Sequence, residues 1–534
     1  MRLLCFALLA AVGCSSTDSD PAVDSPSNAP PAEGAYSPAR FADPSRVDKL
    51  RSALPEIDAL FSAFAKANHV PGIAYGIIID GRLAHTGTAG LRDVGANAPV
   101  DSASVFRIAS MTKSFTALSI LKLRDDGKLS LDDPADRYVP ELANLSYPTT
   151  DSPRLTIRHL LSHSEGFPED NPWGDQQLNR TDDEMAAMMK GGIPFSNPPG
   201  IAYEYSNYGF AILGRIVARV SGQPYATYLR QNILDPLGMQ STTMEAAQVD
   251  PARLARGYRW EDERWKPEPP LPDGAFGAMG GMLTSIDDLA RWVGFLMGAW
   301  PPRSDADDGP VSRASVREMQ QLWRIRPARI THTGGKDALT LLGYGYGLRI
   351  SQTCDFDYIV AHSGGLPGYG SQMRWLPNYG VGIIALGNLT YTAWDGPIAD
   401  ALAALARTGG LQPREPAPST ALNSARDAVS RLVMSWDDQL ADSIAAMNLY
   451  LDEAKDRRQR AIAALVSEVG QCRSDGPFAV ENALRGQWIM PCERGRLRVA
   501  ITLAPTVPPK VQFLSVNKAE ADETLGASPT CPAS

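Results

Sequence analysis

The pattern of apolar and polar positions predicts an antiparallel sheet in the first large region of the chain. An apolar run over Ile73–Ile79 is followed by Asp80-Gly81, a preferred two-residue hairpin turn, and by a second alternating run from Arg82. Strand patterns return much later in the sequence, at Gly345–Ile350, Tyr358–Ala361, Ser371–Trp375 and Val381–Leu386. The sheet is therefore expected to combine strands from both ends of this region.

Helical patterns fill the sequence between those strands. Apolar residues recur at helical spacing in Ser104–Leu123, Thr156–His163, Tyr208–Ser221 and Ser285–Met297. We therefore expect residues 46–408 to form an α/β (α+β) domain, in which helices flank the antiparallel sheet and a helical subdomain is inserted between its strands.

A smaller second domain is expected after a linker. Residues 409–424 are rich in proline and lack an apolar period, which is typical of a linker. Beyond it, residues 425–469 have a helical pattern, and strand patterns follow around Trp488, at Leu497–Leu503 and at Val511–Val516. Residues 425–534 are thus predicted to form a small α+β domain of unknown role, in which we find no catalytic constellation.

Length and composition agree with two folded domains. The chain has 534 residues, which exceeds what a single core usually fills, and 44% of them are apolar and 21% charged, as in globular proteins. The net charge is -9, and Lys and Arg form no cluster that could follow a phosphate backbone. We therefore expect no nucleic acid as a partner.

The first residues are typical of an export signal. One positive charge, a short apolar run and small residues precede Cys14, and the run is too short to span a bilayer. Residues 1–14 resemble a bacterial lipoprotein signal, whose cleavage leaves Cys14 lipidated; an ordinary cleaved signal peptide is the alternative. Residues 15–45 are too polar to fold and are expected to be a tether. The protein would then be exported and lipid-anchored to a membrane of the cell envelope, on the periplasmic side or at the cell surface.

An exported protein can hold disulfide bonds. Cys5 would be lost with the signal, which leaves four cysteines besides the lipidated one: Cys354, Cys472, Cys492 and Cys531. Cys472 and Cys492 are close in sequence within one expected domain, so we favour a bridge between them. The other two could be free thiols.

Ser110-Met111-Thr112-Lys113 combines a hydroxyl and an amine that a helix would bring together. Residues three apart lie on one face of a helix, so Ser110 and Lys113 can touch. A serine hydroxyl needs a base to become a nucleophile, and a lysine can act as that base when burial or nearby positive charge disfavours its charged form. The exposed amides at a helix start also offer the backbone N–H of Ser110 to an oxyanion.

The spacing alone is weak evidence, because Ser119 to Lys122 and Ser515 to Lys518 share it. Ser119 lies well inside the expected helix, where its backbone amide should already be bonded, and Ser515 belongs to the small domain. Of the three serines, only Ser110 is placed where a helix is expected to begin.

A tyrosine and an amide follow on an expected loop. Tyr205-Ser206-Asn207 lies just before a helical segment, and loops commonly carry functional residues. The Tyr205 hydroxyl near the Lys113 amine could relay a proton to the leaving group, and the Asn207 amide could hold the acyl side chain of a substrate. A tyrosine with only a structural role in a turn is the alternative.

His362-Ser363-Gly364-Gly365 joins two expected strands and could form one wall of a substrate cleft. Gly365 would let a substrate approach the backbone and would offer a second N–H to the oxyanion. His85-Thr86-Gly87 and His332-Thr333-Gly334 have a similar pattern. The first precedes Ser110 in the chain, and the second is followed by polar sequence without an immediate pair of strands.

Together these elements resemble the serine β-lactamase and penicillin-binding protein family, whose members carry S-x-x-K, S-D-N and K-T-G motifs. Tyr-Ser-Asn replaces the second motif, as in the class C branch. The resemblance covers about residues 50 to 405 and extends through Leu160–Gly166, Pro236–Met239 and Gly280–Ser285. It implies a β-lactamase/transpeptidase-like fold with a cleft that holds Ser110, Lys113, Tyr205 and His362.

Two departures from the family pattern bear on the substrate. Class C β-lactamases carry a lysine at the position of His362, where it helps to bind the substrate carboxylate. Histidine there is similar to the family's D-amino-acid peptidases and carboxylesterases, and a mostly neutral imidazole holds a carboxylate less firmly. Relatives also tend to have His-Thr-Ser-Gly where this chain has His163-Ser164-Glu165-Gly166. Glu165 could be catalytic, but exposed loop carboxylates are commoner, so we do not count it among the site residues.

His159 and His163 are four residues apart on an expected helix, which is the spacing of a zinc pair. Leu160 and Leu161 occupy the place of the glutamate that a hydrolytic zinc site would need, so we expect packed or supporting roles for both histidines. Because the family resemblance requires no metal either, we expect the protein to use no metal and no other cofactor.

The expected reaction is acyl transfer through a serine-bound intermediate on a small-molecule or peptide substrate, such as a cell-wall peptide or an ester. Lys113 with Tyr205 would take the Ser110 proton, and water would later release the acyl group. A D-Ala carboxypeptidase, a D-aminopeptidase or a carboxylesterase is favoured. The alternatives are a class C-like β-lactamase and, from another class, a non-hydrolytic penicillin-binding sensor or scaffold.

Overall fold

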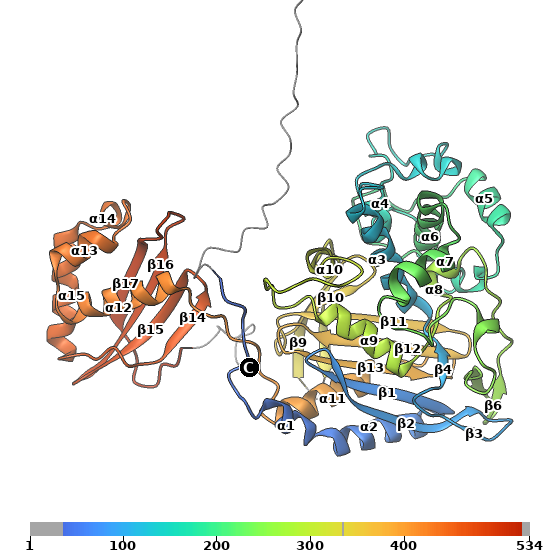
Figure 1. The fold of residues 1–534 in the computed structure, drawn as a ribbon, viewed down its shortest axis with the longest axis horizontal. Coiled ribbons are helices and arrows are strands. Elements are labelled where there is room, and N and C mark those ends of the chain that lie inside the picture. The colour runs from blue at the N-terminus through green and yellow to red at the C-terminus, as the bar shows by residue number, and fades with distance from the viewer. Residues whose placement is uncertain (1–35, 334–335, 526–534) are drawn as a thin grey trace, which may run out of the picture.

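The computed structural model describes residues 36–333 and 336–525, and its large domain is built on one nine-stranded sheet (Figure 1). The strands are antiparallel to their neighbours in the order β3-β2-β1-β13-β12-β11-β10-β9-β8. The expected mixed fold, with strands from both ends of the domain, is confirmed. The strands are β1 (Gly72–Ile79), β2 (Arg82–Asp93), β3 (Ala98–Pro99), β8 (Arg324–Thr333), β9 (Lys336–Tyr344), β10 (Arg349–Gln352), β11 (Ile359–Leu366), β12 (Tyr369–Leu376) and β13 (Val381–Gly387).

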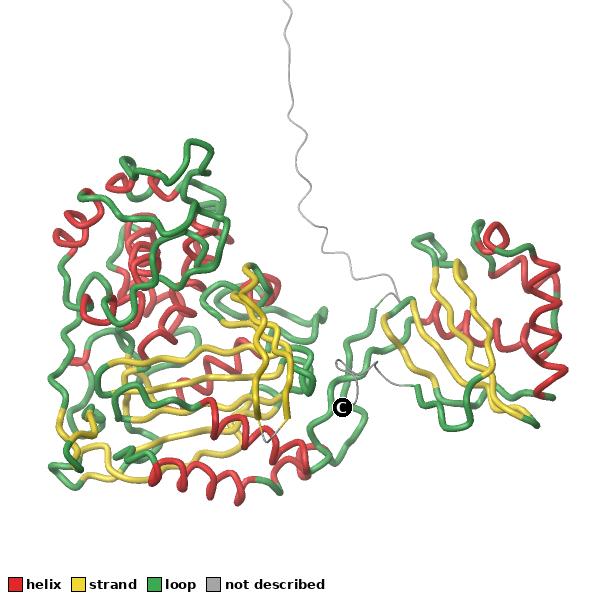
Figure 2. The backbone as a smooth tube through the Cα atoms, turned by 180° about the vertical axis from the view of Figure 1, so that it is seen from behind, coloured by secondary structure: helices red, strands yellow, loops and turns green. Residues whose placement is uncertain are grey.

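Helices cover both faces of this sheet, which explains why β1 is buried along its whole length (Figure 2). Ile77 of β1 belongs to a core shared with α2 (Leu54–Ala67) and α11 (Asp395–Arg407). Ile78 points to the opposite face, because side chains alternate along a strand, and belongs to the core that includes α9 (Ile286–Met297). The sheet is thus the middle layer of three.

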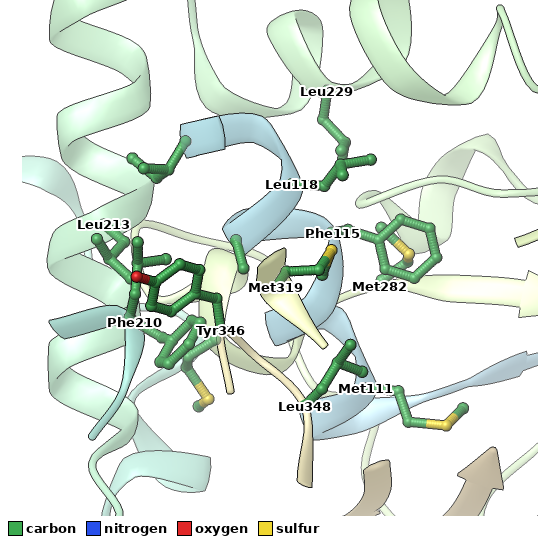
Figure 3. Packing of buried hydrophobic residues seen from close by; sticks show 14 of the residues in the cluster. Met111, Phe115, Leu118, Phe210, Leu213, Leu229, Met282, Met319, Tyr346 and Leu348 are labelled. Atoms are coloured by element: carbon green, nitrogen blue, oxygen red, sulfur yellow. The ribbon is translucent and has the colours of Figure 1, made fainter. Parts of the chain in front are cut away.

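The helical subdomain encloses a core around α3 (Thr112–Asp125). Figure 3 shows Phe115 and Leu118 of α3 among Phe210, Leu213 and other apolar side chains. The remaining elements of the large domain are α1 (Arg46–Arg51), α4 (Ile157–Leu161), α5 (Asp182–Lys190), α6 (Asn207–Ser221), α7 (Tyr225–Leu229), α8 (Gly277–Gly280), α10 (Arg313–Met319), β4 (Val105–Arg107), β5 (Tyr258–Glu261), β6 (Arg264–Pro267) and β7 (Leu283–Ser285).

Two expectations about the large domain are wrong. The helix expected from Ser104 begins only at Thr112, because the residues before it form β4 and a 3-10 turn over Ala109–Met111. The sequence around His332-Thr333-Gly334 does carry a strand pair, since β8 and β9 form a long antiparallel hairpin. This hairpin lacks a clean apolar pattern because arginines alternate with exposed apolar residues such as Ile325.

The small domain packs helices against a four-stranded antiparallel sheet in the order β14-β15-β16-β17, and it stands beside the large domain (Figure 1). Trp488 and Val499 lie in its core. The elements are α12 (Thr420–Met434), α13 (Asp438–Ile444), α14 (Leu449–Asp452), α15 (Lys455–Val469), β14 (Phe478–Asn482), β15 (Arg485–Cys492), β16 (Gly495–Leu503) and β17 (Val511–Lys518).

Cysteines of both domains are disulfide-bonded. Cys472 and Cys492 form a disulfide that ties the chain after α15 to the end of β15. Cys354, in the large domain, is disulfide-bonded as well, so it is not a free thiol. Cys531 lies outside the described residues.

The export signal with Cys14, and the tether up to residue 35, also lie outside the described residues. Within the described ranges, no helix is long and apolar enough to cross a membrane. In the same part of the chain, no group of three or more His, Cys, Asp and Glu side chains is arranged to hold a metal ion.

Candidate active site

Ser110 lies in the 3-10 turn that leads directly into α3. The preceding Ala109 has a φ of 49°, in the left-handed region that residues with a Cβ rarely adopt. The hydroxyl of Thr112 donates to the carbonyl oxygen of Ala109 at 2.6 Å and accepts from the N–H of Met282 at 3.2 Å. The serine therefore sits on a backbone bend that is held by contacts on two sides.

Strand β11 passes directly beside this bend. A Cβ at Gly364 would lie 2.1 Å from the carbonyl oxygen of Ile108, so a side chain there would move the bend. The hydroxyl of Ser371 in β12 donates to the same carbonyl oxygen at 2.8 Å. The structure thus brings Gly364 of His362-Ser363-Gly364-Gly365 against the backbone that leads to Ser110.

The amine of Lys113 is fully buried and contacts Ser110. Its Nζ lies 3.1 Å from Oγ of Ser110, 2.6 Å from Oδ1 of Asn207 and 2.7 Å from the carbonyl oxygen of Met279. Burial lowers the pKa of Lys113 to about 7, although the Asp175 carboxylate opposes this shift. A neutral amine has two N–H bonds, which the oxygens of Asn207 and Met279 can accept, so its lone pair is left for the Ser110 hydroxyl.

Tyr205 contacts the same pair. The Nζ of Lys113 is 4.9 Å from the centroid of the Tyr205 ring, and the ring centroid of His362 is 6.5 Å from it. Burial raises the pKa of Tyr205 well above its usual value, although the hydrogen bond with Ser110 opposes the shift. The phenol is therefore protonated at neutral pH, and of the two groups Lys113 is the better base.

Asn207 begins helix α6 and links it to the loop after α4. Asp170 accepts from the N–H groups of Asn207 and Tyr208 at 2.7 and 2.8 Å. Nδ2 of Asn207 donates to the side-chain oxygen of Asn171 at 2.6 Å, while its Oδ1 accepts from Lys113. In this structure, the amide that the sequence suggested for substrate binding thus orients the lysine amine.

His362 is buried and uncharged. Its Nε2 lies 2.9 Å from the hydroxyl of Tyr344, and its Nδ1 lies 2.7 Å from the carbonyl oxygen of Ser363. Because a carbonyl oxygen only accepts, Nδ1 carries the proton and Nε2 accepts from Tyr344. Burial lowers the pKa of His362 well below its usual value, and the charges of Arg349 and Lys113 add to this shift.

Arg349 places a positive charge beside these groups, and no sequence motif pointed to it. It stands opposite Ala361 at the point where β10 stops pairing with β11, so no strand of the described residues pairs with that edge of β11 from His362 onward. Its charge acts on the pKa values of both His362 and Tyr205. In the described part of the chain, its Nε has no hydrogen-bond partner.

The two histidines with zinc-like spacing have different contacts. Nδ1 of His159 accepts from the N–H of Thr156 at 3.2 Å, within the capping box of α4. His163 lies beyond the end of that helix, and its Nδ1 accepts from the N–H of Ser206 at 3.1 Å. Its ring centroid is 4.4 Å from that of Tyr205. His163 thus supports the loop that carries the tyrosine.

Glu165 is fully buried, which corrects the expectation of an exposed loop carboxylate. Its Oε1 lies 3.9 Å from Nδ1 of His163, and neither carboxyl oxygen has a hydrogen-bond partner among the residues described. Burial raises the pKa of Glu165 well above its usual value. Burial thus favours the protonated form of this carboxyl group.

Comparison with known proteins identifies the family. Residues 57–408 match the family described as Beta-lactamase, so the chain belongs to the beta-lactamase family. Serine hydrolase activity is consistent with this membership.

Individual relatives agree with this assignment. Over 340 residues the chain is 28% identical to Protein flp of Staphylococcus aureus (strain MW2), with 62% of this chain and 63% of that protein covered. Over 301 residues it is 28% identical to a penicillin-binding protein of Bacillus subtilis (strain 168), with 53% and 60% covered. The chain therefore covers less than two thirds of the length of either relative.

A solved structure shares the fold. It is the octameric penicillin-binding protein homologue from Pyrococcus abyssi, which matches with a TM-score of 0.56 and 24% sequence identity, over 84% of this chain and 96% of that chain. At this identity, the match supports the fold and not a particular activity.

Proposed function

We propose that the protein is a serine hydrolase that cleaves an amide or ester bond through an acyl intermediate on Ser110. The observation that carries this proposal is the contact between the Ser110 hydroxyl and the buried amine of Lys113, whose pKa is lowered to about 7. A base with this pKa is partly deprotonated at neutral pH, which is where general base catalysis is most effective.

The chemistry follows from these contacts. Nζ of Lys113 takes the proton as Oγ of Ser110 bonds to the carbonyl carbon, and the C=O electron pair moves onto the carbonyl oxygen. The N–H groups of Ser110 and Gly365 would bind this oxyanion. When the tetrahedral intermediate collapses, the leaving group takes a proton from Lys113 through Tyr205. Water then attacks the acyl carbonyl and gives up one proton, and Oγ of Ser110 gains one as its bond to the acyl carbon breaks, which releases the acid and the free serine.

The charges of the site favour a D-Ala carboxypeptidase, a D-aminopeptidase or a carboxylesterase over a class C-like β-lactamase. His362 is uncharged and stands where class C β-lactamases hold the substrate carboxylate with lysine. Arg349 instead brings a positive charge to the end of β10, beside the unpaired edge of β11. An extended peptide could run along that edge with its carboxylate near the guanidinium.

A location at the cell envelope fits such substrates. Lipid attached at Cys14 would hold the hydrolase near cell-wall peptides and esters. The contact between Ser110 and Lys113 argues against a non-hydrolytic scaffold, which would have no need of a buried base beside a hydroxyl.

Intact-protein mass spectrometry tests this proposal. The chain without residues 1–14 is incubated with a fluorophosphonate and, separately, with a penicillin, beside the variants Ser110→Ala and Ser119→Ala. Ser119 is a matched control because it is buried in the same helix and its hydroxyl only donates to the carbonyl oxygen of Phe115 at 2.9 Å. We expect adducts with the wild type and Ser119→Ala, and none with Ser110→Ala. A long-lived penicillin adduct would support a peptidase or a sensor, a short-lived one a β-lactamase, and no adduct from either reagent would contradict the hydrolase.

A further inference from the structure

A buried carboxylate reaches the active site from the helical subdomain. Asp175 lies in the 3-10 turn Gly174–Gln177 and is 3% exposed. Its Oδ2 accepts a hydrogen bond from the hydroxyl of Tyr391 at 3.0 Å. Its Oδ1 has no hydrogen-bond partner, and no Lys, Arg or His forms an ion pair with it, within the residues that the structure describes. Half of this carboxylate is therefore left without a partner.

Tyr391 approaches from the sheet side of the site. A Cβ at Gly365 would lie 2.5 Å from Cδ1 of Tyr391, so the ring packs directly on this glycine. The N–H of Tyr391 donates to the carbonyl oxygen of Tyr369 at 3.1 Å, which fixes the residue against the start of β12. The hydrogen bond from Tyr391 to Asp175 therefore joins the strand that offers the oxyanion N–H to the helical subdomain.

The turn that carries Asp175 packs against Asn207, whose side chain binds the amine of Lys113. A Cβ at Gly174 would lie 2.6 Å from Cβ of Asn207, whose side-chain oxygen accepts from Lys113. Of the charges that raise the pKa of Lys113, that of Asp175 has the largest effect. Asp175 thus lies close to both the base and the residue that would bind the oxyanion.

A carboxylate in this position is costly without a cation in contact. Burial disfavours its charged form and raises the pKa of Asp175 to about 6, although the charge of Lys113 and the hydrogen bond from Tyr391 oppose the shift. At pH 7 it is still mostly ionised. Buried charges are normally paired, and here the free oxygen is available to a cation that the substrate brings.

We propose that Asp175 binds a positively charged amino group on the acyl portion of the substrate, while Tyr391 forms the side wall over Gly365. The substrate class is then an amide or ester of an amino acid whose α-amino group is free. The ammonium group would donate to Oδ1, and Oδ2 would keep its bond to Tyr391. This inference rests on the proposed hydrolase function and narrows it to aminoacyl substrates.

Two substrates that differ only in this charge test the inference. We would compare D-alanine p-nitroanilide with its N-acetylated form, using the wild type, Asp175→Asn and the control Asp183→Asn, which makes the same change at an exposed position of α5. The wild type should prefer the free amine. Asp175→Asn should lower kcat/KM for the free amine about 10- to 100-fold, as expected when a hydrogen bond to a charged group is lost, and should change the acetylated substrate much less. Asp183→Asn should change neither.

The remaining outcomes separate this inference from the hydrolase itself. Equal losses on both substrates would mean that Asp175 only supports Lys113 electrostatically, and would overturn the inference. A wild-type preference for the acetylated compound, or cleavage of neither compound, would overturn it too. Fluorophosphonate labelling of Ser110 in the same samples shows whether the hydrolase proposal survives. Tyr391→Phe keeps the carboxylate and should therefore keep the preference for the free amine.

Discussion

The Nζ of Lys113 lies 3.1 Å from the Oγ of Ser110, and both groups are buried at the start of α3. The oxygens of Asn207 and Met279 occupy the other two directions around the amine. In water, a lysine would hold its proton to well above pH 7. The packing around α3 (Figure 3) therefore sets both the position of the base and its strength.

Lys113→Arg should abolish most of the activity. An arginine keeps its charge at all accessible pH values and so has no lone pair for the Ser110 proton. We expect kcat/KM and the rate of fluorophosphonate labelling to fall by about 10²- to 10⁴-fold. The control is Lys122→Arg, because Lys122 lies in the last turn of the same helix and only pairs with Asp126. If Lys113→Arg were labelled at the wild-type rate, Lys113 would not be the base.

The pH dependence should report the pKa of Lys113. Only the neutral amine can accept a proton, so the labelling rate should rise with pH and level off above about 7, where burial places this pKa. The negative charge of Asp175 raises the pKa of Lys113, so Asp175→Asn should move the midpoint of the profile to lower pH. The midpoint is measured from the rate of fluorophosphonate labelling at a series of pH values between 5 and 9, with reactions quenched at fixed times. A midpoint that stays in place, or moves upward, would contradict the electrostatic link between these two residues.

Local sequence patterns were enough to predict the first hairpin of the sheet and the contact between Ser110 and Lys113. The Asp80-Gly81 turn could be predicted because Asp and Gly tolerate the positive φ values that such a turn requires. In the structure these values are 51° and 78°. The spacing of Ser110 and Lys113 predicts their contact because one helical turn separates them. Both features are determined by residues close together in the sequence, so the tertiary fold does not alter them.

Features that depend on the tertiary fold were not predicted. Asp175 and Tyr391 are 216 positions apart, and nothing in their neighbourhoods marks them as partners. Arg349 gains its place only where the pairing of β10 with β11 ends. Glu165 was expected to be exposed because its neighbours in the sequence are typical of a loop. It is buried because the loop packs on α6, where a Cβ at Gly209 would lie 2.2 Å from its Oε1.

Gly364→Ala should damage the site. The added methyl carbon would lie 2.1 Å from the carbonyl oxygen of Ile108, so β11 or the bend before Ser110 must shift. We expect a loss of about 1–3 kcal/mol in stability, as for other overpacked sites, together with slow labelling of Ser110. Gly396→Ala in α11 is the matched control, because nothing outside the backbone of its own helix and its chain neighbours lies within 4 Å of the added Cβ. It should leave labelling unchanged and stabilise the domain by about 0.5–1 kcal/mol, and an equal effect of both substitutions would contradict the close approach at Gly364.

Glu165→Gln should stabilise the protein, and the gain should grow with pH. In the folded protein, burial raises the pKa of Glu165 well above its usual value of 4.5. Above that pH the folded chain still holds a proton that the unfolded chain has released, so the wild type loses stability as the pH rises. Glutamine does not titrate and escapes this loss.

The two proteins should therefore differ little at pH 4, and the variant should gain at most about 1.4 kcal/mol for each further pH unit until the folded carboxyl group ionises. His163, whose Nδ1 is 3.9 Å from the carboxyl oxygen, titrates in both proteins and largely cancels in the comparison. Urea unfolding at pH 4, 5.5 and 7, followed by near-ultraviolet circular dichroism, measures the difference. If the difference in unfolding free energy between the variant and the wild type were constant across this range, Glu165 would be ionised in the folded protein. Only a proton that the folded chain retains makes this difference grow with pH.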